Sequence, residues 1–446
     1  MSLPNVDTIA AVATAQGRGG VGVVRISGRD IQRIANGILG SLPKARHATY
    51  ANFLDDKGDT LDQGIALYFS APYSYTGEEV LELQGHGGPA VLHMILQRCV
   101  DLGARLAQPG EFTRRAFLNN KMDLAQAESV VDLIDANSSE AARSAMRSLR
   151  GEFSSAIREL VDALIHLRML VEAMLDFPEE QVDSVDLHRR DVLLKEIRQK
   201  LQHTLETARQ GSLLREGAHI VIAGQPNVGK SSLLNKLSGE EVALVSDIPG
   251  TTRDVIRQAI QLHGVPLHII DTAGLRESED VVENLGIART RQTLHCADLI
   301  LVLLDASQGL TDKDETIIAG LPSGIPRLLV FNKSDLLHEK LPVVEDDRTI
   351  FVSAKTGAGL EALRGLLLEA VGWRAHESGA FMARERHLRA LQQAQRHLQQ
   401  AQEVLSGPEL FAEELRLAQL ALSEITGEFT SDDLLGEIFS RFCIGK

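Results

Sequence analysis

The spacing of apolar and polar residues divides the chain into three kinds of segment. Up to about Gln108, short β-like runs bounded by glycine turns predict a small α+β domain. These runs are 19–27, 65–69 and 80–83, with a helical stretch at 89–101. From about Phe112 to Gln210, apolar residues recur at i, i+3 and i+4, as at Leu160, Leu164 and Leu167, and this spacing predicts long helices.

Between Ala218 and Trp373, apolar runs alternate with helical segments, which is typical of a mostly parallel sheet with crossover helices. The expected strands are 219–223, 267–270, 299–304, 328–331 and 350–352. After Trp373 the helical spacing returns, with a break at Gly407 and Pro408. Helical segments on both sides of one α/β unit favour an α/β domain inserted into a helical domain. Two separate helical domains would give the same pattern.

Length and charge exclude some classes of protein. The 446 residues correspond to about three domains at roughly 100–200 residues each. Lys and Arg number 46 against 61 Asp and Glu, a formal net charge of -15. This balance argues against a protein that coats nucleic acid or an anionic membrane, because such binding needs a basic surface. We therefore expect any RNA contact to be local or shared with a partner.

The cysteines and the apolar runs bear on the compartment. Cys99, Cys296 and Cys443 lie far apart without CxxC spacing, so neither a disulfide framework nor a zinc site is indicated. The sequence shows neither a basic stretch leading into an apolar leader nor a run of about 18 apolar residues. We expect a cytoplasmic protein, from a bacterium or a processed organellar form.

The clearest chemical motif follows the first strand of the α/β unit. Residues 224–231 read GQPNVGKS and match G-x-x-x-x-G-K-[ST] in the required context of strand, loop and helix. Backbone N–H groups of such a loop wrap phosphate oxygens, Lys230 adds charge at the β and γ phosphates, and Ser231 offers a hydroxyl to Mg²⁺. Taken alone, the octet could be an accidental glycine turn.

Three further motifs follow in order: DTAG at 271–274, NKSD at 332–335 and SAK at 353–355. Asp271 can hold a Mg²⁺ water, and the Gly274 N–H can sense the γ-phosphate. Asp335 can accept hydrogen bonds from the N1–H and 2-amino groups of guanine, which adenine does not offer. Backbone N–H groups at 353–355 can meet guanine O6. In this order the motifs are far harder to explain by chance than any one alone, and they predict a GTP site.

The segment between the P-loop and Asp271 contains GTTRD at 250–254, the switch I position, where Thr252 can complete the Mg²⁺ shell. A polar loop is the plain alternative. Leu275 stands where many GTPases have a water-orienting glutamine, so hydrolysis must be assisted differently. The nearby candidates, which could also be solvated charges, are Arg276, Glu277, Glu279 and Glu283.

Over essentially its whole length, the chain resembles the tRNA modification GTPases of the MnmE (TrmE) family. Besides the GTPase motifs, the resemblance rests on GRGGVG at 17–22, LQGHGGP at 83–89, PGEF at 109–112, KMDLAQAE at 121–128 and the terminal CIGK at 443–446. It implies a multidomain α/β and α fold: a small α+β N-terminal domain, a discontinuous helical domain and an inserted Ras-like P-loop GTPase domain. The implied boundaries are 1–118 for the folate-binding and dimerisation domain, 119–213 and 375–446 for the helical domain, and 214–374 for the GTPase domain.

The resemblance also implies an activity. Members are K⁺-activated GTPases that act as homodimers with an FAD-containing MnmG partner and a reduced folate such as 5,10-methylenetetrahydrofolate. They build an aminomethyl or carboxymethylaminomethyl group on C5 of the wobble uridine in certain tRNAs. By the same resemblance, Glu283 aligns with the family's water-orienting glutamate.

The resemblance carries ligand roles onto particular residues. It implies K⁺ ligands at Asn227, Ser246, Ile248 and Thr251, and Mg²⁺ ligands at Ser231 and Thr252. The expected nucleotide-binding residues are Asn227, Val228, Gly229, Lys230, Ser231, Ser232, Ser246, Asp247, Ile248, Pro249, Gly250, Thr251, Thr252, Asp271, Thr272, Ala273, Gly274, Asn332, Lys333, Asp335, Ser353, Ala354 and Lys355.

For folate, Glu82 can accept two hydrogen bonds from the pterin edge, as Asp335 does from guanine. Arg25, Lys121 and Lys446 are candidate counter-charges for the anionic tail. Without the resemblance, each of these is more often an ordinary surface or ion-paired residue. Cys443 could be a nucleophile or acid–base group if Lys446 lowered its pKa, or a small residue that packs the tail.

Two other functions stay open at this point. One is a regulatory GTPase of the ribosome-assembly type, in which the flanking domains only recognise RNA or protein. The other is a folate-binding scaffold with vestigial GTPase activity. The first leaves Glu82, the 109–127 region and the terminal tetrapeptide unexplained.

Overall fold

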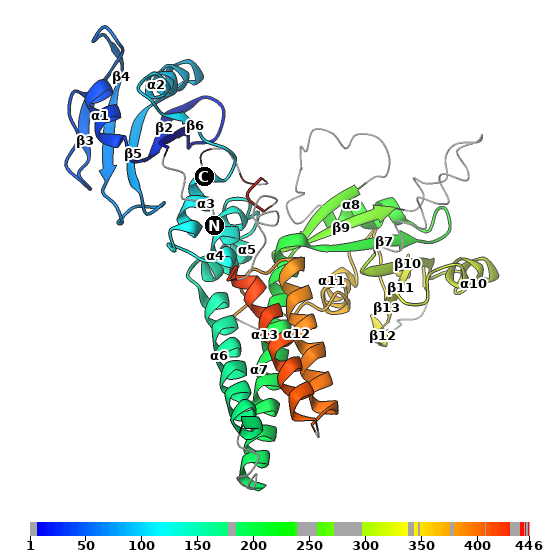
Figure 1. Cartoon of the computed structure of the whole chain (residues 1–446). Helices are drawn as coiled ribbons and strands as arrows, with labels where there is room; N and C mark the ends of the chain where they lie inside the picture. Colours follow the sequence, from blue (N-terminus) through cyan, green and yellow to red (C-terminus); the bar gives the residue numbers. More distant parts are fainter. Residues whose placement is uncertain are drawn as a thin grey trace, which may run out of the picture. The chain divides into compact units, whose positions relative to one another are not determined.

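The computed structural model describes residues 7–176, 184–238, 257–271, 297–337, 343–346, 348–374, 379–405, 407–428, 438–440, 442 and 445 (Figure 1). The chain forms two compact units. The first comprises Met1–Val131, Leu149–Glu179 and Glu403–Lys446, and the second comprises Asp132–Ser148 and Glu180–Gln402.

The first unit contains a mixed sheet in the order β3-β4-β5-β2-β1-β6 (Figure 1). Its strands are β1 (Ile9–Val12), β2 (Gly19–Gly28), β3 (Thr49–Leu54), β4 (Thr60–Phe69), β5 (Glu79–Gly87) and β6 (Arg105–Leu106). Only the β1–β6 pair is parallel among the described pairs. Side chains alternate along β5, where Leu81 and Leu83 are fully buried while Glu82 and Gln84 lie on the other face. The buried face packs against α1 (Ile31–Leu39) and α2 (Pro89–Asp101).

Helices complete the first unit. They are α3 (Glu111–Leu118), the first part of α4 (Leu124–Ile134), α6 (Glu152–Asp176) and α13 (Pro408–Thr426). Arg168 of α6 donates a hydrogen bond to Gln419 of α13 at 2.7 Å, so helices from opposite ends of the chain lie side by side. Phe439 and Phe442 pack against Leu124 in a small apolar cluster.

The second unit is built on a sheet in the order β12-β13-β11-β10-β7-β9-β8. Its strands are β7 (Ala218–Ala223), β8 (Arg257–Leu262), β9 (Val265–Asp271), β10 (Leu299–Asp305), β11 (Arg327–Asn332), β12 (Val344–Asp346) and β13 (Thr349–Phe351). The strands from β13 to β9 are parallel, with β8 and β12 antiparallel at the two edges. Strand β10 is buried throughout, as a central strand covered on both faces must be. This is the Ras-like sheet that the sequence predicts.

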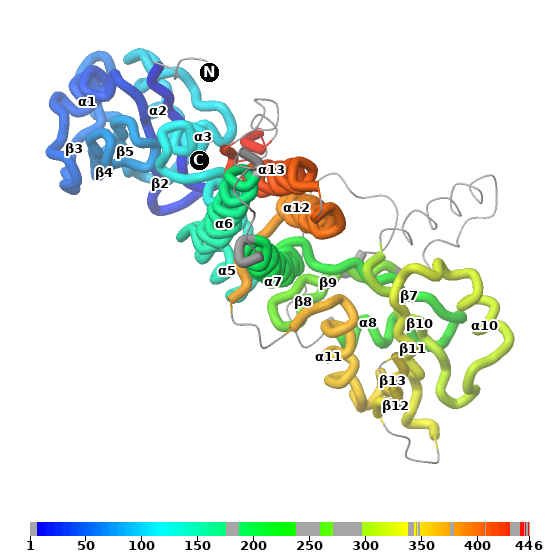
Figure 2. The backbone as a smooth tube through the Cα atoms, turned by 60° about the horizontal axis from the view of Figure 1, so that its bottom comes forward, coloured from blue at the N-terminus to red at the C-terminus, as the bar shows by residue number. Residues whose placement is uncertain are grey.

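Helices cover both faces of this sheet. Figure 2 shows α8 (Lys230–Ser238) and α11 (Leu360–Ala370) on one side and α10 (Asp312–Ala319) on the other. Leucines of α8 and α11 form a large core with the strands, and Ile317 and Ile318 of α10 pack on the opposite face. A short 3₁₀ turn, η2 (Ser334–Leu336), follows β11.

The remaining helices of the second unit come from both sides of the α/β domain. They are α5 (Ser139–Leu149), α7 (Ser184–Glu216) and α12 (Glu385–Glu403). Gln395 of α12 donates to Gln202 of α7 at 2.6 Å. Helices before and after the α/β domain therefore contact each other within this unit, which favours an inserted α/β domain over separate helical domains.

The stretch 112–210 is less uniform than its spacing predicts. It contains the long helices α6 and α7 but also the short α3, α4 and α5, and α7 continues beyond Gln210 to Glu216. Turns rich in Asn, Asp and other polar residues at 119–123 and 135–138 break the apolar spacing. Among the described helices, none combines the length and apolar character needed to cross a membrane.

Candidate functional site

The P-loop connects β7 to α8, and two of its glycines are required by geometry. Gly229 has a φ of 97°, and a Cβ there would collide with Nδ2 of Asn332. Gly224 has a φ of 149°, and a Cβ there would collide with the carbonyl oxygen of Leu303 on β10. The loop therefore passes so close to the neighbouring strand ends that a side chain at either position would displace it.

Lys230 begins α8 and spans the loop. Its ammonium donates hydrogen bonds to the carbonyl oxygens of Gly224, at 2.9 Å, and Gln225, at 3.0 Å. The side chain is nearly buried, and the positive end of the α8 dipole adds to its charge. Ser231 and Ser232 follow on the exposed first turn of the helix. This arrangement suits phosphate oxygens and a Mg²⁺ hydroxyl ligand.

Asn332 joins three segments that are far apart in sequence. Its amide nitrogen donates to the carbonyl oxygen of Val228 in the P-loop at 2.9 Å. Its amide oxygen accepts from the backbone N–H of Ala354 at 3.0 Å. The side chain is buried, so both bonds are shielded from water. Asn332 thus ties the phosphate loop and the SAK loop to the end of β11.

Asp335 lies one turn further, in η2. The Ser353 hydroxyl donates to its Oδ1 at 2.6 Å, and the backbone N–H of Thr356 donates to the same Ser353 hydroxyl at 3.2 Å. Ser353 is fully buried. The carboxylate is therefore held in one orientation, which suits a group that must accept two hydrogen bonds from the edge of a base.

Sequence reasoning missed two polar contacts around this site. Lys333, in a left-handed conformation with φ 65°, donates to Asp305 at the end of β10 at 2.7 Å. Burial would raise the pKa of Asp305, but the bonds from Lys333 and Ser307 outweigh it and lower the pKa below its usual value. Gln225 donates to Thr311 and Asp314 at the N-terminus of α10, both at 2.9 Å. Only the position of Asp305 at a strand end could have indicated the first contact.

Several expected nucleotide residues lie outside the described residues. They are Ser246, Asp247, Ile248, Pro249, Gly250, Thr251, Thr252, Thr272, Ala273, Gly274 and the candidate catalytic Glu283. Asp271 is the last residue of β9, at the same edge of the sheet as the P-loop. Asn227 has a left-handed φ of 63° and is exposed in the P-loop.

A second polar site lies on the open face of the N-terminal sheet. Arg25 and Glu82 are directly opposite each other on β2 and β5, and Arg25 Nε donates to Glu82 Oε1 at 2.9 Å. The other carboxylate oxygen is 3.4 Å from the amide nitrogen of Gln84, a long contact that leaves it able to accept further hydrogen bonds. The structure therefore brings two of the four predicted folate residues together.

Aromatic rings and the chain terminus surround this pair. The Arg25 guanidinium carbon lies 5.7 Å from the ring centre of Tyr75 and 5.8 Å from that of Phe112. Its Nη1 also donates to the carbonyl oxygen of Gly445 at 3.4 Å. Gly445 thus lies beside the predicted folate site, within the same unit.

The other two predicted folate residues are placed differently. The Lys121 ammonium donates to the carbonyl oxygen of Pro72 at 3.0 Å, and its stem lies near Gly77. Lys446 and Cys443 lie outside the described residues. The folate roles of Arg25, Glu82, Lys121 and Lys446 all stay predictions.

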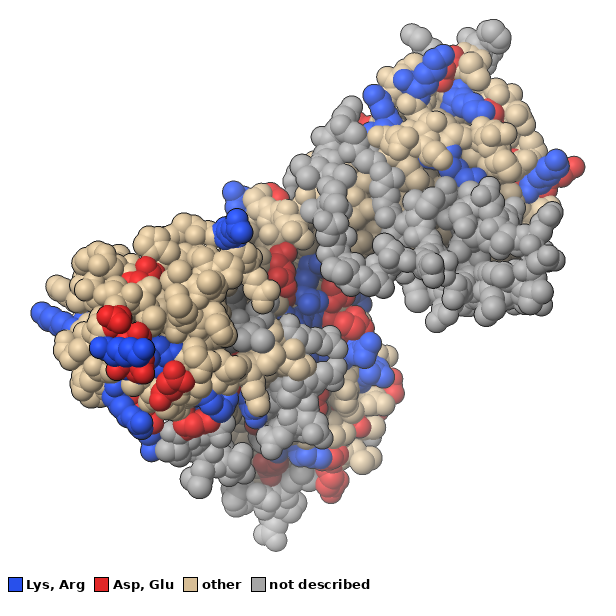
Figure 3. All heavy atoms as spheres, turned by 90° about the horizontal axis from the view of Figure 1, so that it is seen from above, with Lys and Arg blue, Asp and Glu red and all other residues tan. Residues whose placement is uncertain are grey.

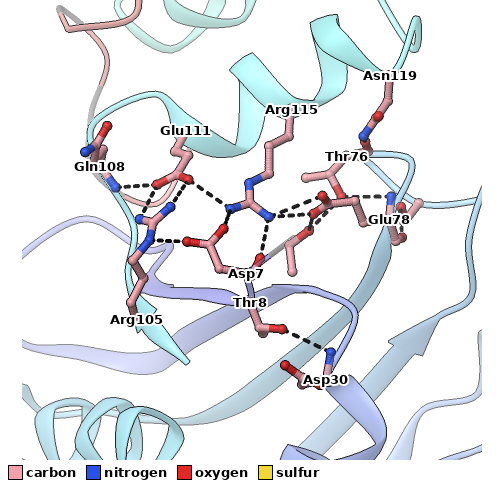
Figure 4. A network of polar contacts seen from close by, with 12 residues as sticks. Asp7, Thr8, Asp30, Thr76, Glu78, Arg105, Gln108, Glu111, Arg115 and Asn119 are labelled. Atoms are coloured by element: carbon pink, nitrogen blue, oxygen red, sulfur yellow. Dashed lines mark hydrogen bonds and ion pairs between the residues drawn. The ribbon is translucent and has the colours of Figure 1, made fainter. Parts of the chain in front are cut away.

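A buried ionic network supports α3 beside this site (Figure 4). Arg115, which is 5% exposed, donates to Glu111, to Glu78 and to both the backbone and the carboxylate of Asp7. Arg105 binds Glu111 through two nitrogens, at 2.6 and 2.8 Å. Burial would raise the pKa of Glu111, but the bonds from Arg105, the Gln108 N–H and Arg115 outweigh it and lower the pKa to about 2. The network fixes the helix that carries Phe112.

Two protein-family models together match most of the chain. The model for the GTP-binding protein TrmE N-terminus matches residues 8–121, and the model for the MnmE helical domain matches residues 124–443. The chain belongs to the MnmE family of tRNA modification GTPases. The prediction of this family from the sequence is confirmed.

Known members of the MnmE family are similar over the full length. The chain is 59% identical to tRNA modification GTPase MnmE of Nitrosospira multiformis over 99% of both chains. It is 60% identical to that of Thiobacillus denitrificans, also over 99% of both. Among solved structures, the G domain of the T. maritima FeoB iron transporter is 25% identical over 34% of this chain and 98% of that chain, with a TM-score of 0.27.

Membership in the MnmE family confirms the main predictions of fold class and enzyme class. The chain is a multidomain protein with a Ras-like P-loop GTPase domain, and it is a GTP hydrolase with a role in tRNA modification. GTP is its substrate. Mg²⁺ is the metal ion that the P-loop serine or threonine binds in GTPases of this class.

Proposed function

We propose that this chain is a K⁺-activated GTPase that acts as a homodimer in the cytoplasm with an FAD-containing, MnmG-type partner. With a reduced folate as one-carbon donor, the pair converts C5 of the wobble uridine of certain tRNAs to an aminomethyl or carboxymethylaminomethyl form. The observation that carries the proposal is that one chain combines a P-loop and an Asp335 carboxylate held by Ser353 with the Arg25–Glu82 pair. The proposed boundaries are 1–118, 119–213, 214–374 and 375–446.

The nucleotide part of the proposal assigns a task to each side of the site. Lys230 and the P-loop N–H groups hold the phosphates, and Ser231 with Thr252 binds Mg²⁺. Asp335 accepts from the base, and Ser353 keeps its carboxylate in place at 2.6 Å. A base without matching N–H donors leaves the fixed Asp335 carboxylate without hydrogen bonds. This loss is the source of selectivity for guanine.

Potassium is assigned to Asn227, Ser246, Ile248 and Thr251. The exposure of Asn227 in the phosphate loop supports this assignment, because an exposed amide side chain is accessible to an ion. A bound K⁺ supplies the positive charge that an arginine finger supplies in other GTPases. Leu275 cannot orient water, so Glu283 is proposed to do so.

Folate is assigned to Arg25, Glu82, Lys121 and Lys446. Oε2 of Glu82 is able to accept from the N–H donors of a pterin edge, and the partly buried Tyr75 beside Arg25 offers a ring for a flat ligand. Bound folate supplies the one-carbon unit. The chain's own residues hold the pterin edge and the anionic tail.

The surface charge bears on how the chain would contact tRNA. Figure 3 shows one face of the molecule, on which Lys and Arg side chains lie among Asp and Glu side chains. This mixture fits the net charge of -15 and supports an RNA contact that is shared with the partner.

The proposal is tested by reconstitution with single omissions. Purified chain, an MnmG-type protein and unmodified tRNA are incubated with GTP, KCl and a reduced folate, and wobble nucleosides are measured by mass spectrometry. The modified nucleoside is expected only in the complete mixture. Full modification without folate would refute the one-carbon donor. GTP hydrolysis with no modification in the complete mixture would favour a regulatory switch.

A further inference from the structure

The connections of an inserted domain are the points at which it can bend. In the second unit, α7 leads into β7 at Glu216, and the chain leaves the Ras-like domain after α11 and returns at α12. If the two connections are flexible, a conformational change caused by the bound nucleotide only bends the connections. If they are held, the change is passed to the helices as movement of a whole domain.

One carboxylate binds both connections. Asp132, in the last turn of α4, is buried, with a side chain that is 4% exposed. Its Oδ1 accepts from Arg215 Nε at 2.9 Å and from Arg384 Nη2 at 2.8 Å. Arg215 is in the last turn of α7, just before the P-loop strand, and Arg384 directly precedes α12.

Further contacts hold the exit segment against the entry helix. Gln210 of α7 is buried, donates to the carbonyl oxygen of Gly372 at 2.7 Å and accepts from the N–H of Arg374 at 3.0 Å. Gly211 lies so close to Phe381 that a Cβ there would collide with the Phe381 carbonyl oxygen. The entry helix and the exit segment are thus held side by side at the described residues 372–374 and 379–384.

The same helical region contacts the hairpin between the switch segments. The turn from β8 to β9 is at His263 and Gly264, and Ser138 donates to the Gly264 carbonyl oxygen at 3.2 Å. Strand β8 follows the predicted switch I segment and β9 ends at Asp271. A cavity of about 360 Å³ borders this contact and is lined by Asp132, Gln261 and Met382 among others.

We propose that Asp132 is a positioning residue that couples the nucleotide state of the Ras-like domain to the surrounding helices. It holds the entry and exit connections together beside the α4–α5 turn, so that a shift of the β8–β9 hairpin moves the whole domain instead of bending its connections. The proposal rests on the GTP hydrolase activity of the MnmE family and requires neither folate nor K⁺ at its proposed ligands.

The test is the distance between spin labels at Lys313 on α10 and Gln393 on α12, both exposed, in the full chain. The labels are placed on non-natural amino acids, so that the native cysteines stay unchanged. Distance distributions are recorded with GDP and with a non-hydrolysable GTP analogue. In the unaltered chain the analogue is expected to shift the distribution. In Asp132→Asn the shift is expected to fall to less than half, with a broader distribution, while GTP hydrolysis without tRNA is unchanged.

Asp135→Asn is the matched control, because Asp135 lies in the same region, is exposed and loses the same charge. It should keep the full shift, and Asp132→Glu should restore part of it. If Asp132→Asn does not fold, as judged by thermal melting, Arg384→Gln removes the exit bond to Asp132, leaves the bond from Arg215 in place and is expected to give an intermediate loss. A full shift in the folded Asp132 or Arg384 variant, or an equal loss in Asp135→Asn, would overturn the proposal. GTP hydrolysis that does not depend on the cation would refute the potassium assignment. The spin-label distances would still test the role of Asp132.

Discussion

The two polar sites of the molecule are built in different ways. In the Ras-like domain, chemistry sits on loops at the ends of parallel strands, and Asn332 and Ser353 fasten those loops to each other. In the N-terminal domain, Arg25 and Glu82 meet face to face through the register of β2 and β5. A loop site follows the order of its motifs along the chain, whereas a strand-face site depends on register. The first can therefore be located from sequence much more directly than the second.

The largest expected effect comes from removing the proposed contact between Asp335 and the guanine base in the GTP site. Asp335→Asn should shift the preference for GTP over xanthosine triphosphate by roughly 10⁴-fold, because an amide donor suits the 2-oxo group of xanthine. Nucleotide affinities measured by competition with a fluorescent GDP would show this. Asp312→Asn, an exposed position on α10 that loses the same charge, should leave base preference unchanged. An unaltered preference in Asp335→Asn would refute the base contact.

The same contrast explains what sequence could and could not predict. The Ras-like sheet and the approach of Asn332 to the P-loop follow from motif order, since the carboxyl ends of parallel strands share one edge. The Lys333–Asp305 bond and the Gln225 bonds to α10 follow from loop conformation, which no spacing encodes. Asp132 carries no motif, and its two arginines lie 83 and 252 residues away. Such contacts need the folded chain.

The second-largest expected effect concerns the ion pairs of Glu111, which hold α3 beside the Arg25–Glu82 site. Because the pKa of Glu111 is lowered to about 2 in the folded chain, its contribution to stability is present above its ordinary pKa of 4.5 and is lost as the pH falls from there toward 2. That contribution is at most about 3 kcal/mol at neutral pH, because the partly exposed Arg105 lets solvent screen the interaction. Urea unfolding of Glu111→Gln should therefore show lower stability at pH 7 and a flatter loss in acid.

Glu152→Gln is the control for Glu111→Gln, because Glu152 is exposed at the start of α6. It should keep the acid dependence of the unaltered chain. An acid profile that is the same in Glu111→Gln and in the unaltered chain would contradict the role of the network.

The smallest expected effect addresses the strand face directly. Glu82→Gln should weaken reduced-folate binding about 10- to 30-fold, since it replaces a charge-assisted acceptor by an amide. Isothermal titration with a reduced folate measures the change. Glu79→Gln on the same strand is the control, because Glu79 instead accepts a hydrogen bond from Tyr68. Equal affinity in Glu82→Gln and the unaltered chain would remove Glu82 from the proposed site.

The central claim is our proposal that this GTPase is activated by potassium and acts as a homodimer. It is tested most directly by initial rates of GTP hydrolysis in matched KCl and NaCl at several protein concentrations. The account predicts a rate that requires K⁺ and rises more than linearly with protein. A rate that is the same in both salts and linear in protein would contradict it.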